Sequence, residues 1–284
     1  MTMTALRNFL GSTRGLLKNP TALAIFAALY AVLLATLYWF SATREATVWQ
    51  VFVTLAGFVV IPAGFFILQA AIVDHARTAR FPWKQIVLDA IKLFVATIPI
   101  ILIGWLLWYL LNKWQVHYPA PKVPFALPPA KPPVPPTHWP TLLFATVRGL
   151  LFGLALPLLT IHLWIEVAGA EVRTLFAGGA APFFKRIGNA CARAFSSNSV
   201  LIYALGLIVF FAIPYVVLFK QVTIKGNKTE FAFFVFRLVL VFVFTLIGWV
   251  VTVGALARNA SRAPEVRQSV APGVSPGEPA VQNS

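Results

Sequence analysis

Residues 48–73 read VWQVFVTLAGFVVIPAGFFILQAAIV and contain no Asp, Glu, Lys or Arg. A helix needs roughly 20 mainly apolar residues to cross the hydrocarbon core of a bilayer. Lipid offers no partners for bare backbone N–H and C=O groups, so an apolar run of this length has to be helical there. The stretch therefore predicts a transmembrane helix.

Five further runs meet the same criterion, and each is ended by charges, prolines or a polar turn. The predicted spans are 21–41, 48–73, 87–111, 142–166, 199–219 and 231–257. The composition agrees, because 59% of the 284 residues are hydrophobic and only 11% are charged, with a mean hydropathy of +0.81. The sequence thus predicts an all-α polytopic membrane protein with about six transmembrane helices, arranged as three hairpins within a membrane domain at 21–263.

The basic residues outside these spans divide unevenly between the two sides, thirteen on the side of the N-terminus and seven on the other. The larger set comprises Arg7, Arg14, Lys18, Arg77, Arg80, Lys84, Arg173, Lys185, Arg186, Arg193, Arg258, Arg262 and Arg267. The positive-inside rule places this side in the cytoplasm, together with both termini. The net charge of +15 therefore indicates topology, and no nucleic-acid partner is expected. Trp83 and Trp164, near the cytoplasmic ends, are read as part of an interfacial aromatic belt.

Basic amphipathic segments precede the three hairpins on the cytoplasmic side. In the first, residues 1–20, the apolar stripe is Leu6, Phe9, Leu10, Leu16 and Leu17, and the basic stripe is Arg7, Arg14 and Lys18. Similar patterns begin at Phe81 and at Phe183. Two interpretations stay open: binding to anionic lipid, to which each surface cation contributes about 1 kcal/mol, or flanks that only set topology.

Two segments are predicted to have no packed structure. The outer loop 112–140 is rich in proline and favours an extended polyproline II conformation. It is read as a spacer between hairpins, with a strand for a protein partner as the alternative. The tail 264–284 has the composition of a disordered cytoplasmic segment.

Two arginines lie inside predicted spans, Arg148 in the fourth and Arg237 in the sixth, each about six residues from the outer end. At 1.5 Å per residue this depth is about 9 Å, so a long side chain can reach the outer interface. Either both arginines simply extend to that interface, or both converge on one anion, such as a lipid phosphate or an anionic solute.

Four further ionisable residues lie near the inner ends of the second and fourth spans: Asp74, His75, His162 and Glu166. If these spans are adjacent, the four residues are candidates for a proton or metal site. A solvated end of each helix is the plainer interpretation, and a local ion pair is expected between Asp89 and Lys92, at positions i and i+3.

Backbone features also point to particular positions. Pro62, Pro99, Pro157 and Pro214 lie centrally in four spans and are expected to kink them. Gly149 and Gly153 form a small-xxx-small pair that would let a neighbouring helix approach closely.

The sequence contains no GxSxG, phosphate-binding glycine loop or HExxH, so neither an enzyme nor a bound cofactor is expected. Its one cysteine, Cys191, excludes an internal disulfide framework and a cysteine-based metal cluster.

The stretch 67–94, ILQAAIVDHARTARFPWKQIVLDAIKLF, loosely resembles uncharacterised bacterial polytopic families akin to the membrane domain of glycerophosphodiester phosphodiesterases. In each, a helix ends in small residues, and a short charged turn leads into an amphipathic segment. The resemblance covers about a tenth of the chain and implies a bacterial inner membrane and a connection with lipid.

We expect a non-enzymatic membrane protein that scaffolds a complex or engages membrane lipids, with a protein partner or a second copy of the chain as further binding candidates. The alternative is a transporter of small solutes or ions. The spans carry kinking prolines but lack charges at the midplane, which places transport second.

Overall fold

The computed structural model describes residues 2–43, 47–119, 138–170, 180–220 and 226–269. These residues are helical and form no strand. The helices are α1 (Thr2–Leu17), α2 (Pro20–Ala42), α3 (Val48–Thr78), α4 (Trp83–Gln115), α5 (Trp139–Leu150), α6 (Leu156–Ala168), α8 (Ala180–Ala194), α9 (Ser197–Leu207), α10 (Ile213–Phe219) and α11 (Asn227–Ser269). Two π-helical turns, η1 (Leu151–Ala155) and η2 (Ile208–Ala212), join α5 to α6 and α9 to α10.

Six helical stretches are long and apolar enough to cross a membrane. They are Pro20–Ala42, Val48–Thr78, Trp83–Gln115, Trp139–Ala168, Ser197–Phe219 and Asn227–Ala260. The prediction of an all-α polytopic fold is therefore confirmed, and the chain is an integral membrane protein.

Most of the spanning helices are longer than the apolar runs that predicted them, because helical hydrogen bonding continues through polar flanking residues. The helix α11, for example, continues to Ser269 and so enters the segment predicted to be disordered. The rest of that tail, 270–284, and residues 120–137 of the proline-rich loop lie outside the described residues.

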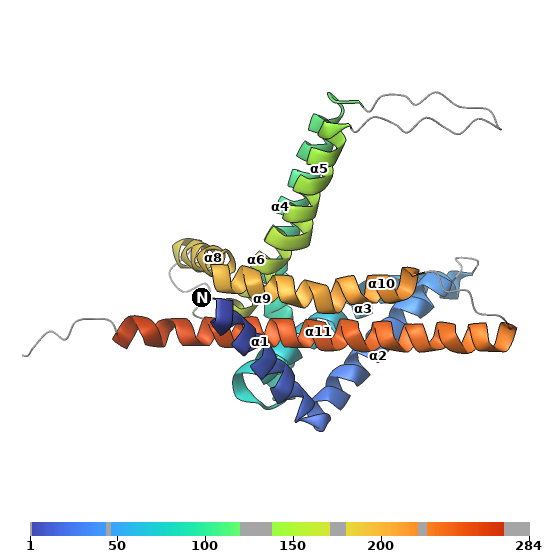
Figure 1. Ribbon diagram of the computed structural model, residues 1–284, viewed down its shortest axis with the longest axis horizontal. Helices are drawn as coiled ribbons and strands as arrows, with labels where there is room; N and C mark the ends of the chain where they lie inside the picture. The colour runs from blue at the N-terminus through green and yellow to red at the C-terminus, as the bar shows by residue number, and fades with distance from the viewer. Residues whose placement is uncertain (1, 44–46, 120–137, 171–179, 221–225, 270–284) are drawn as a thin grey trace, which may run out of the picture.

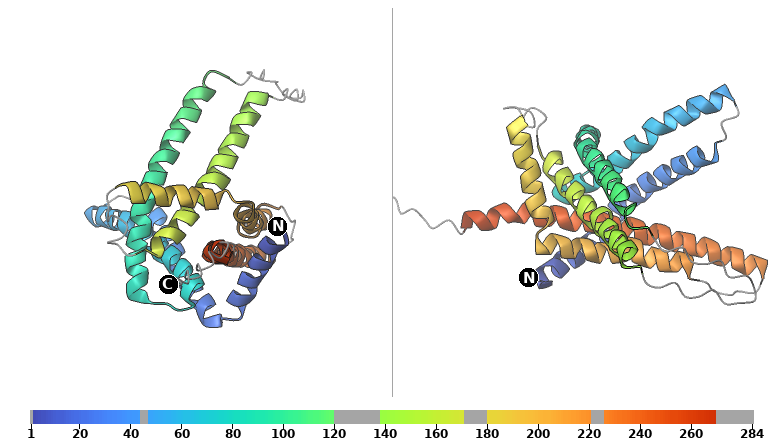
Figure 2. Two further views of the ribbon diagram at one scale, coloured as in Figure 1. Left: turned by 90° about the vertical axis from the view of Figure 1, so that its left-hand side faces the viewer. Right: turned by 90° about the horizontal axis from the view of Figure 1, so that it is seen from above.

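The spans form three hairpins that diverge from a common packed region. Helices α4 and α5 leave this region together, α10 runs beside α11, and α2 pairs with α3 (Figure 1). Seen along two further directions, the three pairs point different ways (Figure 2). The amphipathic helices α1 and α8 lie against the packed region, α1 on α9 and α11 and α8 on α6.

We call this packed region the hub, and it contains most of the buried side chains. Its largest cluster combines the first half of α2, the second half of α3, the start of α4, α6, α9 and the second half of α11, with one face of α1. The far ends of the hairpins instead expose large apolar side chains, such as Trp49, Trp105 and Phe236. An apolar exposed surface of this kind suits contact with lipid.

Two of the four central prolines are accommodated by π-turns. Pro157 lies two residues after the end of η1 and Pro214 two residues after the end of η2, each at the second position of the next helix. A proline has no N–H to donate to the carbonyl four residues earlier, which for Pro157 is that of Gly153. The hydroxyl of Tyr203 on α9 donates to this carbonyl at 3.0 Å. The carbonyl of Gly153 thus links the fourth span to the fifth through this hydrogen bond.

Close helix approach occurs at other glycines than expected. A Cβ at Gly149 or Gly153 would meet nothing within 4 Å, whereas one at Gly206 on α9 would lie 1.9 Å from the hydroxyl of Thr252 on α11. Gly248 on α11 is similarly close to the backbone of η2. Small residues therefore let the third hairpin close, as is usual between membrane helices.

The bond from Tyr203 gives a stability prediction. Tyr203→Phe removes the hydroxyl and leaves the carbonyl of Gly153 without this partner, which should cost about 1 kcal/mol. Tyr215→Phe is the matched control, because Tyr215 is exposed on α10. Thermal unfolding in a mild detergent measures both, and equal melting temperatures for the two variants would contradict the structural role of the hydroxyl.

Candidate functional site

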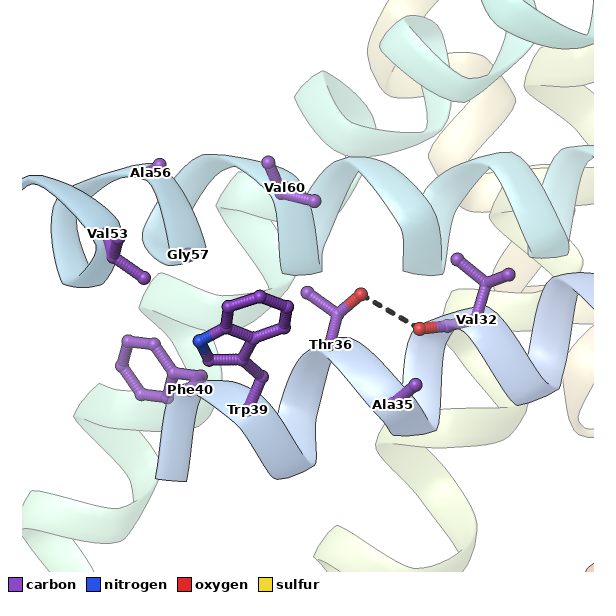
Figure 3. Close-up of a pocket in the computed structure, with 9 residues that line it drawn as sticks. All are labelled: Val32, Ala35, Thr36, Trp39, Phe40, Val53, Ala56, Gly57 and Val60. Atoms are coloured by element: carbon purple, nitrogen blue, oxygen red, sulfur yellow. Dashed lines mark hydrogen bonds between the residues drawn. The ribbon is translucent and has the colours of Figure 1, made fainter. Parts of the chain in front are cut away.

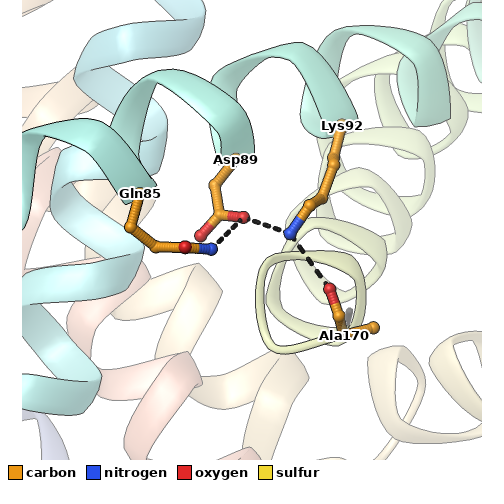
Figure 4. Close-up of polar contacts among 4 residues, drawn as sticks. All are labelled: Gln85, Asp89, Lys92 and Ala170. Carbon is orange, nitrogen blue, oxygen red and sulfur yellow. Dashed lines mark hydrogen bonds and ion pairs between the residues drawn. The ribbon is translucent and has the colours of Figure 1, made fainter. Parts of the chain in front are cut away.

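Two buried charges lie near the start of α4 (Figure 4). The side chains of Asp89 and Lys92 are 1% and 8% exposed, and the ammonium of Lys92 is 2.6 Å from Asp89 Oδ1. The same carboxylate oxygen accepts a hydrogen bond from Gln85, while Lys92 also donates to the carbonyl of Ala170 beyond the end of α6. The predicted ion pair is confirmed, but it is buried inside the hub and ties α4 to α6.

Asp74 on α3 lies beside this pair. Its carboxyl group neighbours that of Asp89 and interacts electrostatically with the cations Arg77 and Lys92. One oxygen, Oδ2, of each aspartate has no hydrogen-bond partner among the described residues. Like charges repel when they are buried beside one another, and the neighbouring cations Lys92 and Arg77 offset part of this repulsion. The cluster therefore joins the first two hairpins through charge.

The candidate residues of the fourth span face a different neighbour. Glu166 on α6 pairs with Arg193 on α8, which fixes the amphipathic helix to the hub. His162, one turn earlier, is buried near Arg193, and its Nε2 has no partner in the described part of the chain. Arg193 lies 27 residues from Glu166 in sequence, so no local spacing indicated this pair.

The ring of His75 packs against two aromatic side chains. Its ring stacks on Phe81, with centroids 4.7 Å apart, and meets the edge of Phe26. Its Nδ1 is buried and has no hydrogen-bond partner within the described ranges. The histidine thus lies on the side of α3 that contacts α2.

The four candidate residues of the second and fourth spans therefore do not form one site. Asp74 joins Asp89, Glu166 joins Arg193, and His75 packs against two phenylalanines. Among the described residues, no group of three or more His, Cys, Asp or Glu side chains is placed to hold a metal ion. The solvated-end interpretation also fails for Asp74 and His162, since both are buried.

The two outer arginines do not converge either. Arg148 donates to Asn112 and to Gln115 on α4, at 2.5 and 2.6 Å, and its guanidinium lies 4.9 Å from the ring centroid of Trp108. Each bond joins the two helices of the second hairpin. The guanidinium is therefore held by its own hairpin.

Arg237 is held in the same way within the third hairpin. It donates to the backbone carbonyl of Lys220 and lies 4.5 Å from the ring centroid of Phe233. Because the second and third hairpins diverge (Figure 1), the anion site shared with Arg148 is not formed in this arrangement.

Two tryptophans are hydrogen-bonded within the spans. The indole of Trp164 is 3% exposed and donates to Thr97 on α4 at 2.8 Å. Trp164 is therefore a core residue and not part of an aromatic belt. Its N–H bonds to a protein group, as is usual for a buried tryptophan. Trp249 on α11 likewise donates to Gln69 on α3. The sequence separation of these pairs hides them from local pattern analysis.

An apolar groove lies between α2 and α3, toward the ends far from the hub (Figure 3). Its volume is about 390 Å³, and Trp39, Phe40 and Val60 are among its lining residues. The hydroxyl of Thr36 donates to Val32 within its own helix. A groove lined in this way offers apolar contacts but few polar groups for catalysis or for binding a polar ligand.

Comparison of the chain with protein-family models, with curated proteins and with solved structures finds no match. Arguments about function therefore rest on the residues and their arrangement.

The buried pair on α4 gives a second prediction. Lys92→Met leaves Asp89 and Asp74 without their buried cation, and removal of one partner from such a pair typically costs about 3 kcal/mol or more. Lys84→Met removes an exposed lysine from the same helix and should change stability by less than about 0.5 kcal/mol. Melting temperatures of the purified variants in detergent measure the difference.

Adding Asp89→Asn to Lys92→Met tests the charge pairing itself. Loss of both charges should cost less than the sum of the single changes, since the second substitution removes the charge that the first left unpaired. Strict additivity, or a Lys92→Met variant as stable as Lys84→Met, would show that the pair does not hold the hub.

Proposed function

We propose that this protein is a non-enzymatic membrane protein of a bacterial inner membrane, with both termini in the cytoplasm, and that it engages anionic lipid at the cytoplasmic ends of its helices. In this orientation the hub lies at the cytoplasmic side.

The division of α1 into three stripes carries the proposal. Ala5, Ser12 and Leu16 are buried against the hub. The apolar stripe predicted from sequence is therefore split, because Leu6, Leu10 and Leu17 remain exposed. An amphipathic helix with exposed leucines lies in the plane of the interface, with those leucines at the boundary of the acyl chains.

The exposed cations of this helix follow a separate stripe. Arg7, Arg14 and Lys18 are all exposed and fall on one face at helical spacing. We call these three residues the basic stripe. Leucines at the acyl boundary would leave these cations at the depth of the headgroups, where each contributes about 1 kcal/mol of attraction to anionic lipid.

At the opposite ends of the hairpins, the two arginines within the spans are less available to bind an anion. Arg148 and Arg237 each donate to groups of their own hairpin. Their cationic groups are therefore already engaged, which favours the cytoplasmic side as the place of lipid binding.

Native mass spectrometry from a mild detergent tests the proposal. Arg7→Gln, Arg14→Gln and Lys18→Gln, combined in one variant, should reduce the affinity for phosphatidylglycerol by about five-fold for each charge removed. The number of anionic lipids retained per protein should fall accordingly, and the same spectra would reveal a bound protein partner or a second copy.

The matched control removes three exposed lysines from the other side, as Lys113→Gln, Lys220→Gln and Lys228→Gln in one variant. It makes the same change in net charge. Equal lipid loss from both variants would indicate only general charge attraction, and unchanged lipid retention without the basic stripe would refute the proposal.

Transport of a proton or ion is the second candidate, because the carboxyl pair of Asp74 and Asp89 is buried between helices. Both residues lie close to the ends of their helices, Thr78 and Trp83, whereas transporters place coupling sites near the midplane. Reconstituted vesicles with an imposed proton gradient decide the matter. We expect the gradient to persist as long as in protein-free vesicles, and faster dissipation would favour transport.

A further inference from the structure

A pocket of about 200 Å³ with both apolar and polar lining residues lies where α1, α2, α3 and α11 meet at the surface of the hub. Its polar lining residues are Ser12, Asn19, His75, Arg77 and Arg258. None of the described residues that line it is Asp or Glu. The pocket thus has two cationic side chains and no carboxylate in its lining; Arg77 also interacts with Asp74, which lies outside the lining.

Two residues that line this pocket have a buried polar atom without a hydrogen-bond partner among the described residues. Ser12 is 5% exposed, and its hydroxyl oxygen makes no hydrogen bond to any described residue. The Nδ1 atom of His75 is also buried and unpartnered in the described chain. A buried hydroxyl without a partner costs roughly 1–3 kcal/mol, so a ligand that accepts its hydrogen bond is favoured.

Both arginines line the pocket, and each lies close to a glycine of a neighbouring segment. A Cβ at Gly15 would lie 3.2 Å from Arg258 Nη2, so the absence of a side chain there lets the guanidinium lie against α1. The guanidinium of Arg77 lies against Gly169, just beyond the end of α6, at a residue that does not line the pocket. Both arginines are exposed, and they can therefore be reached by an anion from the interface.

The start of α2 adds to this positive character. The side chain of Asn19 accepts from the N–H of Ala22 at 3.0 Å, and Pro20 is the first residue of the helix. The N-terminus of a helix carries about half a positive charge, which favours a nearby anion.

We infer that this pocket binds a phosphate group, with Arg258 and Arg77 as the charged ligands and Ser12 as a hydrogen-bond donor. The inference rests on the proposed lipid engagement and names its specific site. A volume of about 200 Å³ is several times the roughly 30 Å³ that one water occupies in the liquid, so a tetrahedral phosphate fits. The phosphate belongs to an anionic lipid headgroup or to free inorganic phosphate, two sources with the same chemistry.

Titration calorimetry on the full-length protein in a phosphate-free, uncharged detergent tests the inference. The probes are a short-chain phosphatidylglycerol and inorganic phosphate, titrated separately. We expect saturable binding that weakens at least about ten-fold in Arg258→Gln and several-fold in Ser12→Ala, because charge-assisted bonds contribute more than neutral ones. Tighter binding of the lipid identifies the headgroup as the source, and equal binding identifies free phosphate.

Arg80→Gln is the matched control, since Arg80 is exposed at the same side of α3 and does not line the pocket. It should bind both probes as the unmodified protein does. Equal weakening in Arg80→Gln and Arg258→Gln, or no saturable binding of either probe, would overturn the inference. Ser12→Ala keeps the charge unchanged, so it reports on the pocket even if Arg258→Gln does not fold.

The same titration on the variant without the basic stripe separates the pocket from the proposed function. Saturable binding that persists in this variant supports the pocket, whatever the mass spectra show for the stripe. Lipid loss on neutralising the stripe, together with no saturable site in the unmodified protein, overturns the pocket and leaves the proposed function standing.

Discussion

Helices inside a bilayer gain little from one another through the hydrophobic effect, because lipid tails are as apolar as leucine. Their association must come from close packing and from polar groups that lack water. The hub uses both: Gly206 meets Thr252 at close range, and Lys92 is enclosed by Asp89 and the carbonyl of Ala170. The buried lysine is the central contact, since it binds α4 to the end of α6 while the carboxyl pair reaches α3.

This concentration of polar contacts at one end explains the shape of the molecule. The outer halves of the hairpins carry few polar groups, and those described there, such as Arg148 with Asn112, act within a single hairpin. Little therefore holds the three pairs together beyond the hub, and they diverge (Figure 2). The proposed side of lipid binding is the side where polar contacts, exposed cations and the amphipathic helices are gathered.

Local sequence patterns predicted the parts of this architecture that depend on local periodicity. Six apolar runs gave the spans, and the spacing of Asp89 and Lys92 gave their ion pair. The same patterns could not predict that the pair is buried, because its burial depends on Ala170, 78 residues away from Lys92. Arg193, the partner of Glu166, lies 27 residues away, so local patterns could not predict this pair either.

The sequence also could not predict which residues of the apolar stripe on α1 are buried and which stay exposed. Phe9 and Leu16 pack on the hub while Leu6 and Leu10 do not, and the positions of α9 and α11 decide this. The pocket beside α1 has the same origin, since Ser12 and Arg258 meet only after the first and last helices have packed. The proposed lipid-binding features therefore depend on contacts between segments far apart in the chain.

Photo-cross-linking in nanodiscs tests the central claim most directly. A phosphatidylglycerol with a diazirine near its headgroup would be activated around the intact protein, and peptide mapping would locate the modified residues. The account predicts modification in α1 and around Arg258, at the hub. Modification confined to the far ends of the hairpins, around Arg148 and Arg237, would contradict it.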